Sequence, residues 1–275
     1  MDDLFLSPLQ MSRAISDIGE KKACESIFEL FIFGILAGIY IAFGAAVATA
    51  VLSGQTMDAG LARFLAGSVF SLGLILVLII GSELFTGNIL MTIGLIYRRY
   101  SFVKVLRNWL VVYFGNFFGA VIIAWLVYKS GLLGSLGNFT PIGEIAVKIT
   151  ETKMELNFTE ALCRGILCNM LVCLAVIMSI ASRTIEGKIL GIYFPIMAFV
   201  ASGYEHSVAN MYFLPAGLMA KGEFMLGFFK SFNNLIPVTI GNIIGGLLIV
   251  LLHPKVEEKI ARTFIQRRDK ECQKV

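Results

Sequence analysis

Charged residues are scarce in this chain of 275 residues. Only 15% are Asp, Glu, Lys or Arg, whereas 57% are hydrophobic. A soluble domain of this size carries about a quarter charged residues. Apolar stretches with almost no charge recur along the chain, each near the ~20 residues that a helix needs to cross a bilayer. This leaves no room for a separate soluble domain and predicts an all-α integral membrane protein.

Histidine and cysteine are also few, and their positions exclude common catalytic and metal sites. The two histidines form neither a His-Glu-x-x-His motif nor a metal-binding pair, and no Ser/His/Asp set lies at a plausible depth. We therefore expect no intramembrane enzyme, no metal and no cofactor. Three of the five cysteines repeat every five residues, which rotates each by roughly 140° on a helix, so they cannot face one metal. We interpret these three, Cys163, Cys168 and Cys173, as apolar packing residues. The other two cysteines are Cys24 and Cys272.

The N-terminal segment 1–27 lacks the basic region of a signal peptide, since it begins Met1-Asp2-Asp3. It contains Ser7-Pro8-Leu9-Gln10, a capping box with Pro at the first helical position. Apolar residues then follow at helical spacing. The segment therefore predicts a short amphipathic helix on the cytoplasmic surface of the membrane.

Six spans are expected within a single transmembrane domain, 28–253. Their ranges are 28–53, 62–97, 109–128, 158–181, 189–219 and 234–253. Polar residues interrupt the second span at 82–88 and the fifth at 202–207. A longer polar connection, 129–157, separates the two halves.

Lys and Arg are distributed unevenly between the two sides. Because six spans place both termini on one side, that side holds 16 Lys or Arg, many in the tail 254–275, and the opposite loops hold six. The positive-inside rule puts both termini in the cytoplasm, across the cytoplasmic membrane. The basic tail suits a solvated cytoplasmic face. Nucleic-acid binding is not expected, because no aromatic residues interleave its basic residues.

Three short motifs recur in the same order in the two halves, 28–128 and 158–253. They are Glu29-x4-Gly34-Ile35-Leu36 with Glu160-x4-Gly165-Ile166-Leu167, Glu83-x4-Asn88 with Glu205-x4-Asn210, and Gly115-Asn116-x-x-Gly119 with Gly241-Asn242-x-x-Gly245. Each half holds three spans, so the second copy must enter the membrane from the opposite face. This predicts an inverted repeat whose interrupted helices, the second and fifth, mark a transport site near the midplane.

The two interruptions predict an environment that favours anions. Unwound backbone at membrane depth is tolerated only where it is buried in protein or lines an aqueous cavity. The second half-helices are expected to begin near Gly87 and Ser207, and their N-termini carry the positive end of the helix dipole. Two such ends that converge on a pore disfavour cations and attract anions.

Glu83 and Glu205 are acidic residues within these interruptions. Each recurs with an Asn partner five residues on, Asn88 and Asn210. Because the pairs are symmetric, we interpret them as hydrogen-bonding staples of the breaks rather than as a cation site.

Three segments of the chain resemble the formate/nitrite transporter family. They are Leu84-Phe85-Thr86, Ala201-Ser202-Gly203-Tyr204-Glu205-His206-Ser207-Val208-Ala209-Asn210-Met211 and Ile236-Pro237-Val238-Thr239-Ile240-Gly241-Asn242. The likeness covers essentially the whole chain, and within the family the sequence is most similar to the hydrosulfide ion channel subgroup of clostridia. The resemblance implies a homopentamer of aquaporin-like protomers, each with its own pore.

The resemblance also implies roles for individual positions. The pore centre falls on His206, Thr86, Asn169 and Asn210. The apolar constrictions fall on Leu84, Phe85 and Val172 on the inner side, and on Phe70, Leu74 and Phe199 on the outer side. The vestibule lysines are Lys22 on the cytoplasmic side and Lys153 on the outer side. From the residues alone, Thr86 could equally cap a half-helix, both lysines could be solvated loop charges, and the apolar residues could be plain core. An ionisable residue at bilayer depth, such as His206, indicates function.

The resulting hypothesis is passive conduction of small monovalent anions of weak acids, with hydrosulfide favoured and formate and nitrite included. Vestibule lysines and helix dipoles concentrate the anion, while the apolar constrictions make a naked charge costly. His206 and Thr86 hydrogen-bond the anion and could lend it a proton. One alternative is a proton-coupled formate/nitrite symporter. A second is a neutral-solute pore of the water or glycerol type, which the phenyl-rich constrictions and the lack of an Arg near either break oppose.

Overall fold

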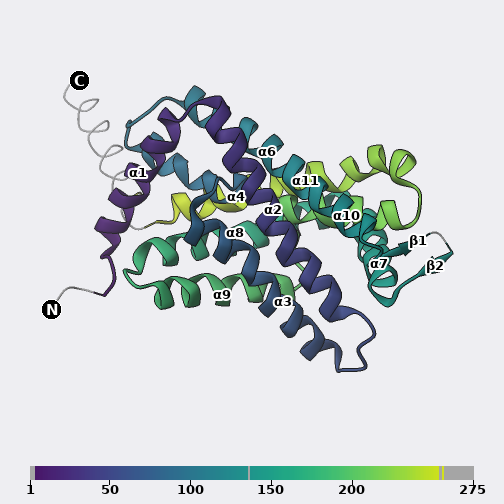
Figure 1. Cartoon of the computed structure of the whole chain (residues 1–275). Helices are drawn as coiled ribbons and strands as arrows, with labels where there is room; N and C mark the ends of the chain where they lie inside the picture. The colour runs from purple at the N-terminus through teal and green to yellow at the C-terminus, as the bar shows by residue number, and fades with distance from the viewer. Residues whose placement is uncertain (1–3, 136, 254–255, 257–275) are drawn as a thin grey trace, which may run out of the picture.

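A computed structural model describes residues 4–135, 137–253 and 256, and it is a helical bundle (Figure 1). Within these residues, five helical segments are long and apolar enough to cross a membrane. They are α2 (Ile27–Leu52), α3 (Ala59–Leu76) with the π-turn η1 (Val77–Gly81), α6 (Phe102–Lys129), α8 (Phe158–Ala181) and α11 (Phe224–Leu251). Helices α6 and α11 begin well before their expected spans, because their first turns carry Lys, Arg and Asn and extend beyond the apolar run.

The expected second span is divided. After Gly81, which has a φ of +91° that glycine adopts without strain, the chain is non-helical over 82–84. Three short pieces follow: α4 (Phe85–Asn88), the 3₁₀ turn η2 (Ile89–Met91) and α5 (Thr92–Ile96). Helix α4 begins two residues before the expected start at Gly87.

The expected fifth span is divided in the same way. Helix α9 (Ile185–Ala201) has 17 residues and α10 (Ser207–Ala220) has 14, and a non-helical stretch separates them. Each is shorter than the ~20 residues of a full crossing. Six crossings therefore stay a prediction, because α9 and α10 would have to form one crossing together.

The N-terminal helix α1 (Pro8–Cys24) starts with the predicted capping box. Ser7 and Gln10 each accept the other's backbone N–H, which confirms this cap. Helix α1 also contacts the rest of the bundle, and its position on the membrane surface stays a prediction. It packs through Ile15, Gly19 and Ala23 on α5, η2, α6 and α8, because these small and apolar residues share one face. The predicted basic tail 254–275 and Cys272 lie outside the described residues, apart from Val256.

The connection 129–157 contains structure that the sequence analysis missed. A two-stranded hairpin, β1 (Gly134–Ser135) and β2 (Asn138–Phe139), precedes helix α7 (Pro141–Met154). The Thr140 side chain accepts the Gly143 N–H and caps α7, with Pro141 at its first position. Helix α7 lies at the end of the bundle opposite α1 (Figure 1).

Glycines bring the helices of each half into close contact. A Cβ on Gly119 of α6 would lie 2.1 Å from the carbonyl oxygen of Ile35 on α2, and a Cβ on Gly245 of α11 would lie 2.2 Å from that of Ile166 on α8. Small residues that let backbones approach are typical of helix packing in membranes. The two halves also interlock, since α10 packs on α6 and α4 packs on α8.

One prediction concerns the seat of α1. The Oγ of Ser12 lies 3.2 Å from Nδ1 of His253, just beyond the end of α11, and burial lowers the pKa of this histidine. Burial favours the neutral imidazole, so docking of α1 is most stable at pH values above the ordinary histidine pKa of about 6.5. Protonation of His253 at lower pH opposes docking, and the stability of the docked helix falls. Hydrogen exchange of the α1 amides, corrected for intrinsic rates, should therefore accelerate between about pH 7.5 and about pH 5.5.

The variant His253→Gln serves as the matched comparison, because it keeps a polar side chain that does not titrate. Its α1 exchange should not depend on pH over this range. Equal pH dependence in the variant and the wild type would show that His253 does not control the docking of α1.

Candidate functional site

The first break is held by the amide of Asn116 on α6. Its Oδ1 accepts the backbone N–H of Phe85 at 2.9 Å, while its Nδ2 donates to the carbonyls of Gly34 at 2.8 Å and Glu83 at 2.9 Å. The side chain is fully buried. Peptide groups that have left a helix at membrane depth need such partners, because no water can serve them there.

The second break is held by Asn242 on α11 in the same manner. Its Oδ1 accepts from Ser207 N at 2.9 Å, and its Nδ2 donates to the carbonyls of Gly165 at 2.8 Å and Glu205 at 3.0 Å. Every one of these positions has its counterpart in the first half. The repeated Gly-Asn-x-x-Gly motif contains both clamping residues, although the sequence analysis did not assign them a role at the site.

His206 and Thr86 meet between the two breaks. His206 is the N-cap residue of α10, and its Nδ1 accepts the N–H of Ala209 at 3.1 Å. The proton of the neutral ring is therefore on Nε2, which lies 2.8 Å from the Thr86 hydroxyl oxygen and donates to it. Thr86 lies inside α4 and does not cap it, because the N-cap is Leu84. With His206 as the donor in this pair, the Thr86 hydroxyl proton is available to another acceptor.

A charged triad lies on the α1 side of this pair. The ammonium of Lys22 donates to Asn88 Oδ1 at 2.7 Å and forms an ion pair with Glu83 Oε1 at 2.9 Å. Asn88 Nδ2 donates in turn to Glu83 Oε2 at 2.7 Å and to Asn108 Oδ1 at 2.8 Å. Glu83 and Asn88 thus bond to each other as the repeat predicts, and the sequence analysis missed Asn108.

A second triad lies on the α7 side. Lys153 donates to both carboxylate oxygens of Glu205, at 2.8 and 3.0 Å. Asn210 Nδ2 donates to Glu205 Oε2 at 2.6 Å and to Asn234 Oδ1 at 2.7 Å. The Lys153 and Glu205 side chains are only 13% and 5% exposed. The two vestibule lysines therefore carry paired charges, and their attraction for an anion is weaker than that of a free ammonium.

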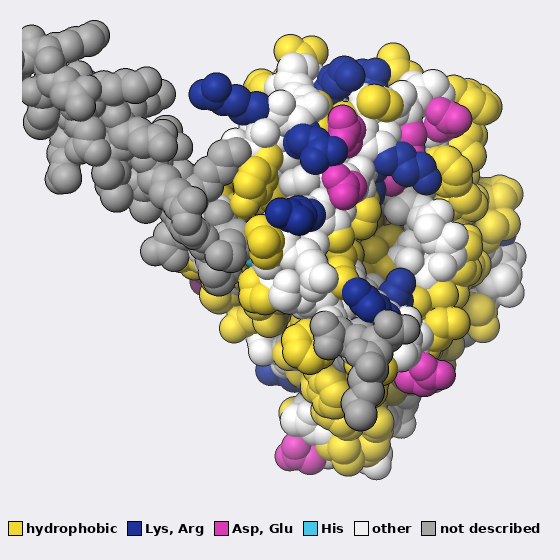
Figure 2. All heavy atoms as spheres, turned by 90° about the vertical axis from the view of Figure 1, so that its left-hand side faces the viewer, with side chains coloured by type: hydrophobic (Ala, Val, Ile, Leu, Met, Phe, Trp, Pro, Cys, Tyr) yellow, Lys and Arg dark blue, Asp and Glu magenta, His cyan; other side chains and the backbone are white. Residues whose placement is uncertain are grey.

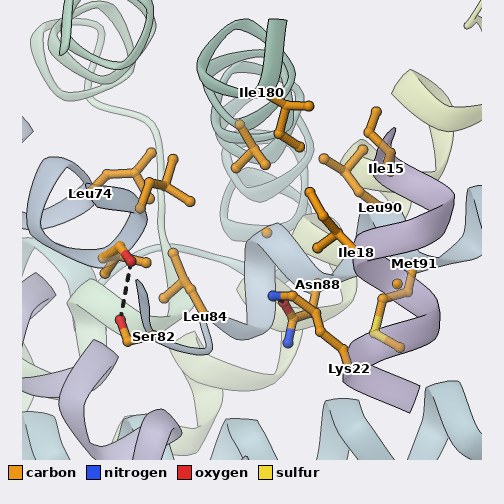
Figure 3. A pocket seen from close by; sticks show the side chains of 15 residues that line it. Ile15, Ile18, Lys22, Leu74, Ser82, Leu84, Asn88, Leu90, Met91 and Ile180 are labelled. Atoms are coloured by element: carbon orange, nitrogen blue, oxygen red, sulfur yellow. Dashed lines mark hydrogen bonds between the residues drawn. The ribbon is translucent and has the colours of Figure 1, made fainter. Parts of the chain in front are cut away.

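A small cavity approaches the centre from the α1 side. It encloses about 50 Å³, and Lys22, Leu74, Leu84 and Asn88 are among its lining residues (Figure 3). It shares Lys22 with a wider mouth of about 330 Å³, whose further charged residues are Lys21, Glu25, Glu83 and Lys188. Figure 2 shows this face, with Lys and Arg side chains around a hollow that has an apolar interior.

A second cavity, of about 170 Å³, approaches from the α7 side. Phe70, Phe199, Lys153 and His206 are among its lining residues. The Phe199 ring stacks on the His206 imidazole at 5.9 Å, and Phe70 packs edge-on against Phe199 at 5.6 Å. The phenyl rings thus cover His206 on the α7 side. On the α1 side, Leu84 lies between the cavity and Thr86.

One predicted constriction residue lies on the opposite side from the one expected, and two others line no cavity described above. Leu74, expected on the outer side with Phe70, lines the α1-side cavity, because one helical turn carries it toward the break. Phe85 lines none of the cavities described here, because its ring packs on Trp109 and Tyr113 of α6. Val172 is buried and also lines none of them.

Asn169 on α8 links helix α4 to helix α11. Its Nδ2 donates to the backbone carbonyl of Asn242 at 2.6 Å and to that of Thr86 at 3.2 Å. Asn169 therefore holds the backbone that presents the Thr86 hydroxyl, and its place at the pore centre stays a prediction.

Comparison with known proteins gives a consistent result. A family model described as formate/nitrite transporter matches residues 9–255. The chain is 42% identical to a probable formate transporter of Methanothermobacter thermautotrophicus, over 91% of this chain and 96% of the relative. It is 37% identical to the formate channel FocA of Escherichia coli K12, over 90% and 92%.

Two solved structures resemble this fold. A pentameric formate channel with formate bound has a TM-score of 0.71 at 35% identity, covering 82% of this chain and 94% of that chain. An ion channel of the FNT family has a TM-score of 0.79 at 28% identity, covering 88% and 96%.

The α7-side triad yields a test of stability. Lys153→Met should destabilise the protein by about 3–5 kcal/mol, because it leaves the Glu205 carboxylate buried without its cation. Adding Glu205→Gln to that variant should recover most of the loss, since the remaining pair carries no charge. Thermal unfolding in detergent measures both. If the double variant has no higher unfolding temperature than Lys153→Met alone, the ion pair with Glu205 is not the way in which Lys153 stabilises the protein.

Proposed function

Because this chain belongs to the formate/nitrite transporter family, we propose that it conducts small monovalent anions of weak acids across a membrane. Formate, nitrite and hydrosulfide are its proposed substrates. The curated relatives reported above are named as channels or transporters, and the chain is not an enzyme. The observation that carries the proposal is the Thr86–His206 pair, which lies between two opposed cavities.

The proposed route begins at the mouth near Lys21 and Lys188 and continues into the α1-side cavity. It then passes Leu84, reaches the Thr86–His206 pair, and leaves past Phe199 and the α7-side cavity. The apolar side chains on both sides of the pair make it costly for hydrated cations and large solutes to pass. The pair itself provides the hydrogen bonds that a small anion loses with its water.

At the centre, the anion accepts a hydrogen bond from the Thr86 hydroxyl, whose oxygen is held by His206 Nε2–H. The N-terminus of α10, where His206 lies, adds positive potential. A proton loan would require the imidazolium form, and Nδ1 would then have to release the Ala209 N–H that it accepts. The observed geometry therefore favours hydrogen bonding over proton transfer.

The wider architecture follows the same proposal. The matching hydrogen-bond sets of Asn116 and Asn242 support an inverted repeat of six crossings with interrupted second and fifth members. The α1 side is proposed to be cytoplasmic, because the basic loops and tails lie on the side of the termini. The pentameric channel that resembles this chain supports a homopentamer.

Among the anions, hydrosulfide is our favoured substrate, and this preference rests only on the sequence resemblance to the clostridial hydrosulfide subgroup. Formate has the support of the relatives named above.

The symporter alternative differs in its electrical behaviour. Obligatory proton coupling moves no net charge, so it predicts uptake with external alkalinisation and no steady formate current under voltage clamp. A channel predicts a current that reverses at the formate equilibrium potential. A water or glycerol pore predicts neither.

Thr86 provides the most selective test. Thr86→Val keeps the volume but removes the hydroxyl, so formate flux into liposomes at a clamped potential should fall about ten-fold, the cost of an unmet hydrogen bond. Thr86→Ser keeps the hydroxyl and should retain most of the flux. Replacement of His206 by Ala should also lower the flux, because it removes the Nε2–H that holds the Thr86 hydroxyl oxygen. Wild-type flux in Thr86→Val would exclude a role for the central pair.

A further inference from the structure

The two lysine triads differ in several contacts, and one of these is the partner of the asparagine oxygen. On the α1 side, Asn88 Oδ1 accepts from Lys22. On the α7 side, Lys153 bonds only to Glu205, and Asn210 Oδ1 is buried without a partner among the described residues. An unmet buried acceptor costs free energy, so a native protein that keeps one needs a reason.

The orientation of the Asn210 amide is fixed by its neighbours. Its other end faces Glu205 Oε2 and Asn234 Oδ1, and both of these are acceptors. The amide of Asn234 is fixed in turn, because its Nδ2 donates to the carbonyl of Lys153 at 2.9 Å. Asn210 must therefore place its nitrogen toward these acceptors, and its oxygen is the free atom.

The two lysines also have different neighbours. The Lys153 ammonium lies 5.2 Å from the centroid of Phe213, within the range of a cation–π contact. The corresponding residue on the α1 side, 122 positions earlier, is Met91. Methionine has no ring to attract Lys22, which bridges Glu83 and Asn88 instead.

We propose that Lys153 and Asn210 form a binding site on the α7 side for a small solute that carries one X–H donor beside an electron-rich atom. The electron-rich atom accepts from the Lys153 ammonium, and the X–H group donates to Asn210 Oδ1. Hydrosulfide meets both requirements, and so does an undissociated weak acid, whereas formate and nitrite anions lack the donor. Lys153, Asn210 and Phe213 all line the α7-side cavity, which supplies the path.

The inference rests on the proposed conduction of anions and adds a preference that the α1 side does not share. Phe213 acts as a positioning residue, since it keeps Lys153 from occupying Asn210 Oδ1. Removing the ring should let Lys153 adopt the arrangement of Lys22 and donate a hydrogen bond to Asn210 Oδ1. A ring at position 91 should have no such effect on the α7 side, which makes the mirror exchange a matched control.

The test compares hydrosulfide and formate currents in planar bilayers at about pH 8.5, where both solutes are anions. Phe213→Met should lower the hydrosulfide-to-formate conductance ratio about three-fold, the share of one weak hydrogen bond. Met91→Phe should not lower it. An unchanged ratio in Phe213→Met would overturn the proposal. Absence of formate current in the wild type would instead contradict the proposed function.

A second experiment tests the same proposal by structure. It needs neither a measurable current nor a Phe213→Met variant that folds. Cryo-electron microscopy of the wild type in lipid nanodiscs, with and without hydrosulfide, should show density between Lys153 Nζ and Asn210 Oδ1 that depends on hydrosulfide. Identical density in sulfide-free buffer would identify a water molecule only. An absence of density in both maps would show that no ligand binds between these atoms. Both results overturn the proposal.

Discussion

Two buried asparagine amides stabilise the two helix breaks in this protein. Asn116 and Asn242 each accept the first N–H after a break and donate to the carbonyl of the glutamate within it, so the peptide groups that leave the helix keep their partners. Without them, unwound backbone at this depth would be too costly to persist. Every functional feature depends on these breaks, because they bring His206, Thr86 and both cavities to one place.

The same constraint explains why the lysines are not free. Each break carries a buried glutamate, and a buried carboxylate is stable only with a cation and hydrogen bonds around it. Lys22 and Lys153 provide the cation, so the anion attraction proposed for these lysines is combined with a structural role at the breaks. Potential near the mouth then comes in part from Lys21 and Lys188, which no ion pair among the described residues neutralises.

Much of this arrangement follows from local sequence. The bounds of α8, the capping box at Ser7 and the Glu–Asn pairs can be predicted because each depends on spacing within one segment. The side on which Leu74 lies and the burial of the Phe85 ring depend on how helices rotate against each other, which spacing does not fix. Helix α7 was missed because its composition is polar, although Thr140-Pro141 is a recognisable helix start.

The measurement that tests this account most directly is a cryo-electron microscopy map of the chain in lipid nanodiscs with formate. The account predicts non-helical backbone at 82–84 and 202–206, Asn116 and Asn242 bonded across the breaks, and formate beside the Thr86 hydroxyl. Continuous helices through either segment, or a His206 side chain that faces lipid, would contradict it.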